Sequence, residues 1–74
     1  MVEIFIKEKY ILLGQFLKFS GVISNGGEAK FFLVENSVLV NNTPENRRGK
    51  KLYNNDVIEV LGQKFIVKEK DCEN

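Results

Sequence analysis

The segment LLGQFLKFSGVISNGGEAKFFLVEN, residues 12–36, decides the fold because it holds two helical patterns around a glycine-rich turn. In the first pattern, Leu13, Phe16 and Leu17 follow the three-and-four spacing of one helix face. Gly21 follows this run and is a natural helix stop. The sequence therefore predicts a short helix from Leu13 to Ser20.

The second helical pattern begins in the turn Ser24-Asn25-Gly26-Gly27-Glu28. Asn25 can cap a helix, and Glu28 stands three residues further on, which is the spacing of a capping box. Ala29, Phe32 and Leu33 then form an apolar stripe, and the helix is expected to end near Asn36, a residue that tolerates a left-handed cap. Two short helices therefore meet across the glycine-rich turn.

The rest of the chain has the alternation and turn residues of β-structure. Val2–Ile6 predicts an opening strand at a sheet edge, and Pro44 predicts an irregular or edge segment, since proline cannot donate to a central ladder. Further strands are expected over Val38–Val40, Val57–Leu61 and Lys64–Lys68. Turns are expected at Asn41-Asn42, Asn54-Asn55-Asp56 and Gly62-Gln63.

These elements predict an α+β domain in which two short helices pack on one face of a small antiparallel sheet of four to five strands. The expected domain covers residues 1–68, and residues 69–74 form an expected frayed polar tail. The predicted core consists of Phe16, Leu17, Ala29, Phe32, Leu33, Val38, Val40, Leu52, Ile58, Val60 and Phe65.

Composition limits the classes of function. A chain of 74 residues fits one small hydrophobic core. No run approaches the ~20 apolar residues of a membrane span, and residues 1–8 lack a signal-peptide core, so we expect a cytoplasmic protein with no membrane partner. There is no histidine, and the one cysteine, Cys72, lies in the polar tail. We therefore expect no metal site, no cofactor, no small-molecule substrate and no enzymatic activity.

Positive charge is concentrated in one short segment although the formal net charge is only +1. Arg47, Arg48, Lys50 and Lys51 surround Gly49, and no acidic residue lies among them. Such a segment can meet successive phosphates, because arginine offers a bidentate fork and lysine a point charge. We call residues 47–51 the basic loop. The plainer interpretation is a solvated turn that keeps a small protein soluble.

Five segments in a fixed order resemble the S4 (S-four) RNA-binding domain, first seen in the small-subunit ribosomal protein four. They are LGQFLK at 13–18, GGEAK at 26–30, VLVN at 38–41, RRGKKL at 47–52 and DVIEV at 56–60. The order of the segments is more specific than any one of them. Within the family, the chain is most similar to the stand-alone YaaA-type proteins of bacteria.

The resemblance implies a helix-turn-helix of the alpha-L type, followed by strands, that binds structured RNA such as ribosomal or tRNA-like RNA. The ribosome or its precursor is the expected partner. The family's contacts, at the start of the second helix and in the loop between strands, match Asn25, Gly26, Gly27, Lys30, Arg47, Arg48, Lys50 and Lys51. Lys18 of the first helix is a further candidate. Many members carry Ser-Arg where this chain has Ser24-Asn25, so one expected cation is absent.

Other interpretations of these residues stay open at this point. Paired glycines often serve only to make a sharp turn. Tyr10 and Tyr53 have the chemistry to stack on an unpaired base, although packing as half-buried residues is the favoured interpretation. The competing class of function is a protein-interaction adaptor that uses the same basic face or an edge strand.

Overall fold

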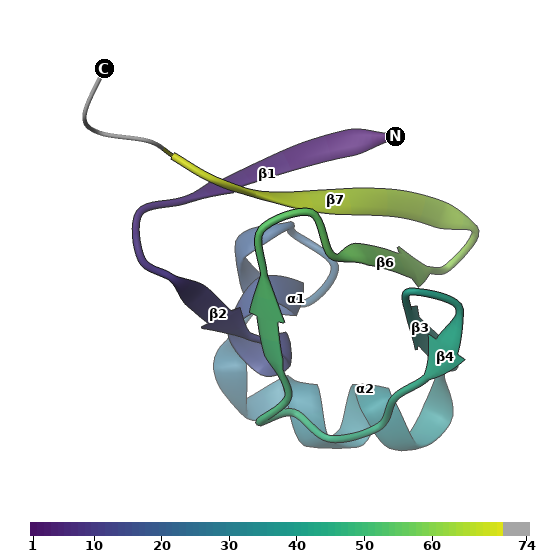
Figure 1. Ribbon diagram of the computed structural model, residues 1–74. Helices are drawn as coiled ribbons and strands as arrows, with labels where there is room; N and C mark the ends of the chain where they lie inside the picture. The colour runs from purple at the N-terminus through teal and green to yellow at the C-terminus, as the bar shows by residue number, and fades with distance from the viewer. Residues whose placement is uncertain (71–74) are drawn as a thin grey trace.

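The computed structural model describes residues 1–70 and confirms the α+β class, with two α-helices, a short 3-10 helix and seven strands in that part of the chain. In chain order they are β1 (Val2–Ile6), β2 (Tyr10–Leu12), α1 (Leu13–Phe19), η1 (Gly26–Glu28), α2 (Ala29–Glu35), β3 (Val38–Val40), β4 (Thr43–Pro44), β5 (Lys51–Tyr53), β6 (Val57–Val60) and β7 (Gln63–Glu69). Both helices lie on the same side of β6 and β7 (Figure 1).

The main sheet has five strands in the order β1-β7-β6-β3-β4. It is mixed rather than antiparallel as expected, because β1 pairs with β7 in parallel, and the two strands run side by side in Figure 1. Side-chain alternation reports which face a residue occupies and says nothing about strand direction, so the sequence pattern missed this. The expected edge positions of β1 and of Pro44 in β4 are confirmed.

A second sheet, of two strands, joins β2 to β5 in antiparallel register. The sequence did not predict β2, because its three residues directly precede α1 and Leu12 fits the helical spacing equally well. This small sheet places the end of the basic loop next to the start of α1.

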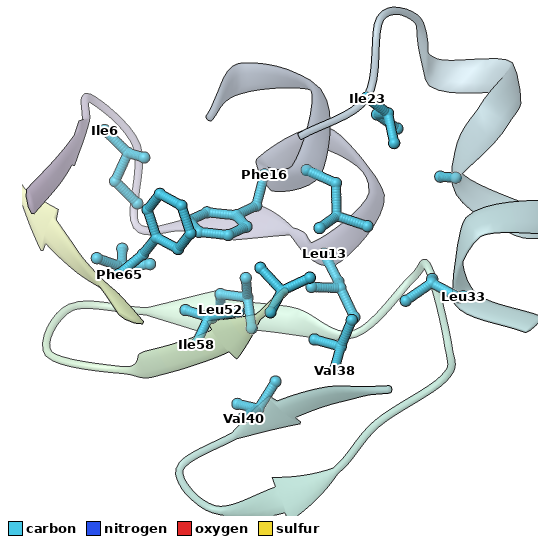
Figure 2. Close-up of a cluster of buried hydrophobic side chains, with 14 residues drawn as sticks. Ile6, Leu13, Phe16, Ile23, Leu33, Val38, Val40, Leu52, Ile58 and Phe65 are labelled. Atoms are coloured by element: carbon cyan, nitrogen blue, oxygen red, sulfur yellow. The ribbon is translucent and has the colours of Figure 1, made fainter. Parts of the chain in front are cut away.

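The core lies between the helices and the sheets (Figure 2). Every predicted core residue is buried except Phe32, which is partly buried and packs against the cluster. Phe16 is fully buried and meets Phe65 edge to face, with ring centroids 5.5 Å apart. The buried residues that the pattern missed are Ile6, Leu13, Ile23 and Val67.

Asparagines occupy the positive-φ positions of the turns, and so does one leucine that the sequence gave no reason to expect. Asn41 and Asn42 have φ values of 53° and 69°, which confirms the predicted reversal. The β6–β7 turn is shifted by one residue, because Val60 pairs with Gln63 and leaves Leu61 and Gly62 as the turn, with φ values of 52° and 77°. A leucine at positive φ is uncommon, so the pattern gave no sign of it.

Two ends of elements also differ from the expectation. α2 ends at Glu35, next to the predicted Asn36, but this capping asparagine is extended (φ −129°) rather than left-handed, and its side-chain amide donates to the Phe32 carbonyl. At the chain end, Glu69 belongs to β7 and the Lys70 N–H donates to the Ile6 carbonyl (2.7 Å), so two residues of the expected tail pair with β1. Residues 71–74, including Cys72, lie outside the described residues.

Candidate nucleic-acid interface

The basic loop is held against the first turn of α1 by backbone hydrogen bonds. The Leu13 N–H donates to the Lys50 carbonyl (2.8 Å), and the Gly14 N–H donates to the Arg48 carbonyl (2.9 Å). The first N–H groups of a helix have no partner within the helix, so the loop carbonyls satisfy two of them. These hydrogen bonds fix the backbone of the loop and therefore the Cα positions of its cationic residues.

Gly14 allows α1, α2 and the basic loop to converge. A Cβ atom at this position would lie 3.3 Å from the Cβ atoms of both Ala29 and Arg48, which is closer than carbon atoms normally approach. Sequence reasoning included Gly14 only in a matching segment and gave it no role. A glycine near the start of a helix, where it is a poor helix former, was the available signal.

An open groove of about 750 Å³ lies where these three elements meet. Its lining is Leu12, Gly14, Gln15, Lys18, Phe19, Gly26, Ala29, Arg48 and Gly49, and we call it the α1–α2 groove. Three of the predicted site residues, Lys18, Gly26 and Arg48, therefore gather in one hollow. No carboxylate of residues 1–70 lines it, so its charge is positive.

The glycine turn forms η1 rather than the first turn of α2. The predicted capping box is wrong in detail: the Asn25 side chain makes no capping hydrogen bond, and the Glu28 carboxylate accepts from the Ser24 N–H (3.0 Å). Asn25 is extended, and the tighter 3-10 turn that follows it moves the start of α2 to Ala29. Asn25, Gly26 and Gly27 are all exposed, and Gly26 reaches the groove.

The four cations of the basic loop do not act as one group. Arg47 forms an ion pair with Glu45, with Nε 2.8 Å from Oε2. The hydrogen bond from the Arg47 side chain is the main cause that lowers the pKa of Glu45 below its ordinary value. Lys50 and Lys51 line a separate hollow of about 400 Å³. Arg48 alone of the four lines the α1–α2 groove.

The remaining candidate, Lys30, is exposed on the first turn of α2, next to Ala29 but outside the groove lining. Tyr10 and Tyr53 are 40% and 49% exposed and lie against each other, which is the half-buried packing favoured from the sequence, and each ring keeps part of its surface open to solvent. Phe19, which sequence reasoning did not consider, is exposed and lines the groove.

The described residues form neither a metal-binding cluster nor a membrane-spanning helix. Within residues 1–70, no three histidine, cysteine, aspartate or glutamate side chains are grouped so as to hold a metal ion. None of the helices there has the length and apolar character needed to cross a membrane.

Comparison with known proteins agrees with this geometry. A family model described as the S4 domain matches residues 4–68. The chain is also 58% identical, over 57 residues, to a Bacillus subtilis (strain 168) protein named "Probable ribosome maturation protein RlbA", and the match covers 77% of this chain and 80% of that protein. Neither match is to an enzyme family. The resemblance noted from the sequence is confirmed, and the chain belongs to the S4 RNA-binding domain family.

Proposed function

We propose that this protein binds structured RNA, ribosomal RNA or its precursor, in the cytoplasm. The observation that carries the proposal is the α1–α2 groove, in which Lys18, Gly26 and Arg48 line one hollow without a carboxylate from the described residues. The printed name of the Bacillus relative, a probable ribosome maturation protein, supports a ribosomal partner.

The groove suits a phosphate backbone better than a base edge. Two cations from different elements line it, Lys18 from α1 and Arg48 from the basic loop, and its glycine and alanine residues leave room for a backbone to approach closely. Double-stranded RNA is recognised mostly by its shape and by phosphate and 2′-hydroxyl contacts, because its major groove is too narrow for side chains to read. We therefore propose recognition of RNA shape rather than of base sequence.

The other predicted site residues surround the groove and widen the contact. Asn25 and Gly27 flank Gly26 in the chain, Lys30 lies on the first turn of α2, and Lys50 and Lys51 follow Arg48 along the basic loop and line a neighbouring hollow. Arg47 contributes less, because Glu45 neutralises it. If four to six phosphates are neutralised, the logarithm of affinity should fall against the logarithm of salt concentration with a slope of roughly −3 to −5.

Co-sedimentation with ribosomal particles tests the proposal. The wild-type protein should sediment with the particles and be released by ribonuclease. Changing Arg47, Arg48, Lys50 and Lys51 together to Ser should keep the fold and flatten the salt dependence. Recovery that resists nuclease and depends on one protein would instead support the adaptor interpretation.

A matched pair of double variants separates the groove from general charge. Lys18→Ser with Arg48→Ser removes two positive charges from the groove, whereas Lys64→Ser with Lys70→Ser removes two exposed positive charges elsewhere. The groove variant should release the particles at much lower salt than the control. Equal loss in both variants would contradict the groove as the site.

A further inference from the structure

Two exposed tyrosines face each other across the small β2–β5 sheet. Tyr10 and Tyr53 are directly opposite in the antiparallel register, with ring centroids 5.9 Å apart and planes tilted by 53°. The Lys51 Nζ lies 4.9 Å from the centroid of the Tyr10 ring. We call Tyr10 and Tyr53 the tyrosine pair.

The tyrosine pair lies on the face of this sheet that does not contribute to the core. Along β5, Lys51 and Tyr53 are exposed while Leu52 between them is fully buried, as strand alternation requires. Each ring therefore covers its neighbour and still presents 40% to 49% of its residue surface to solvent. Packing of the core leaves this exposed aromatic surface unexplained.

The tyrosine pair is continuous with the α1–α2 groove. Gln15 and Phe19 line the groove and also line a second hollow, of about 410 Å³, whose lining includes Tyr10. On the other side of the pair, Tyr53 lines the hollow that contains Lys50 and Lys51. A nucleic-acid strand that is bound in the groove and leaves it past Phe19 would therefore reach the tyrosine pair.

The charge beside the tyrosine pair favours an anionic partner, such as a nucleic acid, over a cationic one. Glu45 and Asp56 also line the hollow beside Tyr53, but both carboxylates already have partners in the protein. Glu45 is paired with Arg47, and Asp56 accepts hydrogen bonds from the Asn41 side chain (3.0 Å) and the Tyr53 N–H (2.8 Å). The donors to Asp56 are neutral, so only Glu45 is balanced by a cation, and Lys50 and Lys51 outnumber the one carboxylate whose charge remains unbalanced in this hollow.

We propose that the tyrosine pair stacks on an unpaired base of the RNA whose duplex part occupies the α1–α2 groove, with Lys51 placed to meet the adjoining phosphate. This inference rests on the proposed function and adds a second type of contact to it. Aromatic stacking tolerates any base, since every base has a π-face. The protein would thus recognise a junction between duplex and single strand.

Intrinsic fluorescence provides a direct test, because Tyr10 and Tyr53 are the only tyrosines and the chain has no tryptophan. The probes are an RNA hairpin with a single-stranded adenosine tail and the same hairpin with an abasic tail, which keeps the phosphates and removes the bases. The adenosine tail should quench tyrosine fluorescence and bind roughly 5- to 150-fold more tightly than the abasic tail.

Variants then assign the effect to the pair. Tyr10→Leu with Tyr53→Leu keeps apolar side chains on the sheet and should abolish the preference for the adenosine tail. Phe31→Leu, at a 68% exposed aromatic residue on α2, is the matched control and should keep that preference. If the double variant folds poorly, the comparison of the two hairpins with the wild-type protein still tests the stacking.

The outcomes distinguish this inference from the proposed function. Tight, equal binding of both hairpins without quenching would overturn the role of the tyrosine pair and leave RNA binding intact. Failure of both hairpins and of ribosomal RNA to bind would overturn both proposals. A protein partner whose nuclease-resistant binding requires the two tyrosines would also overturn the stacking role.

Discussion

Arg48 and Arg47 are adjacent and chemically identical, yet the structure predicts different effects when each is replaced. Arg48 lines the α1–α2 groove, and its carbonyl is held by the Gly14 N–H. Arg47 is paired with Glu45. Loss of one charge-assisted contact costs about 1.5–3 kcal/mol, so Arg48→Gln should weaken RNA binding roughly 10- to 150-fold. It should also reduce the salt slope by about 0.7–0.9.

The matched control removes the ion pair as a unit. Glu45→Gln with Arg47→Gln deletes one charge of each sign, so affinity and salt slope should stay close to the wild-type values. Fluorescence anisotropy with a labelled ribosomal RNA fragment, titrated at several salt concentrations, measures both quantities. Arg48→Lys should keep the slope while losing the bidentate geometry.

Two results would refute this reasoning. One is an equal loss of affinity in Arg48→Gln and in the neutral pair variant. The other is an unchanged salt slope in Arg48→Gln, which would mean that no phosphate is neutralised in the groove.

Three further predictions concern stability. Leu61→Asn should stabilise the fold by about 0.5–1 kcal/mol in urea unfolding, because Leu61 has a φ of 52° that asparagine adopts more readily; Leu61→Ala should give no such gain. Gly14→Val should cost about 1–3 kcal/mol, seen as a lower Tm, because even a Cβ lies 3.3 Å from Ala29 and Arg48, and a variant as stable as wild type would contradict the close approach. Glu45 has a folded pKa below its ordinary value of 4.5, so its stabilising effect is present above pH 4.5 and is lost as pH falls through the lower folded value. The stability difference between wild type and Glu45→Gln should therefore shrink in acid, and a difference independent of pH would argue against the ion pair.

Local pattern predicted much of the fold. The spacing of Leu13, Phe16 and Leu17 predicted α1, and the Asn41-Asn42 dipeptide predicted a turn with positive φ values, because both signals depend on neighbouring residues. The parallel pairing of β1 with β7 and the three-residue β2 were missed, since both depend on contacts between distant parts of the chain.

The candidate site likewise combines features that local sequence predicts with features that depend on contacts between distant residues. The sequence identified the basic loop and the glycine turn, and the structure brings Arg48 and Gly26 into one groove. The sequence pattern gave no reason to distinguish the four cations of the loop. In the structure Arg47 forms an ion pair with Glu45, and Lys51 lies against the Tyr10 ring in the β2–β5 sheet. Which side chain neutralises which is set by tertiary geometry, and no spacing rule carries that information.

The bonds between the first turn of α1 and the carbonyls of Arg48 and Lys50 also bear on when this protein becomes active during synthesis. A nascent chain that has emerged only as far as α2 already exposes Lys18 and the glycines, but the carbonyl acceptors that fix the helix start are still inside the ribosome. RNA that binds only the completed surface would stabilise the folded state, by about 2.7 kcal/mol when the free RNA concentration is a hundred times the dissociation constant. Release from the RNA would return the protein to its own modest stability, which makes the unbound pool the more accessible target for proteolysis.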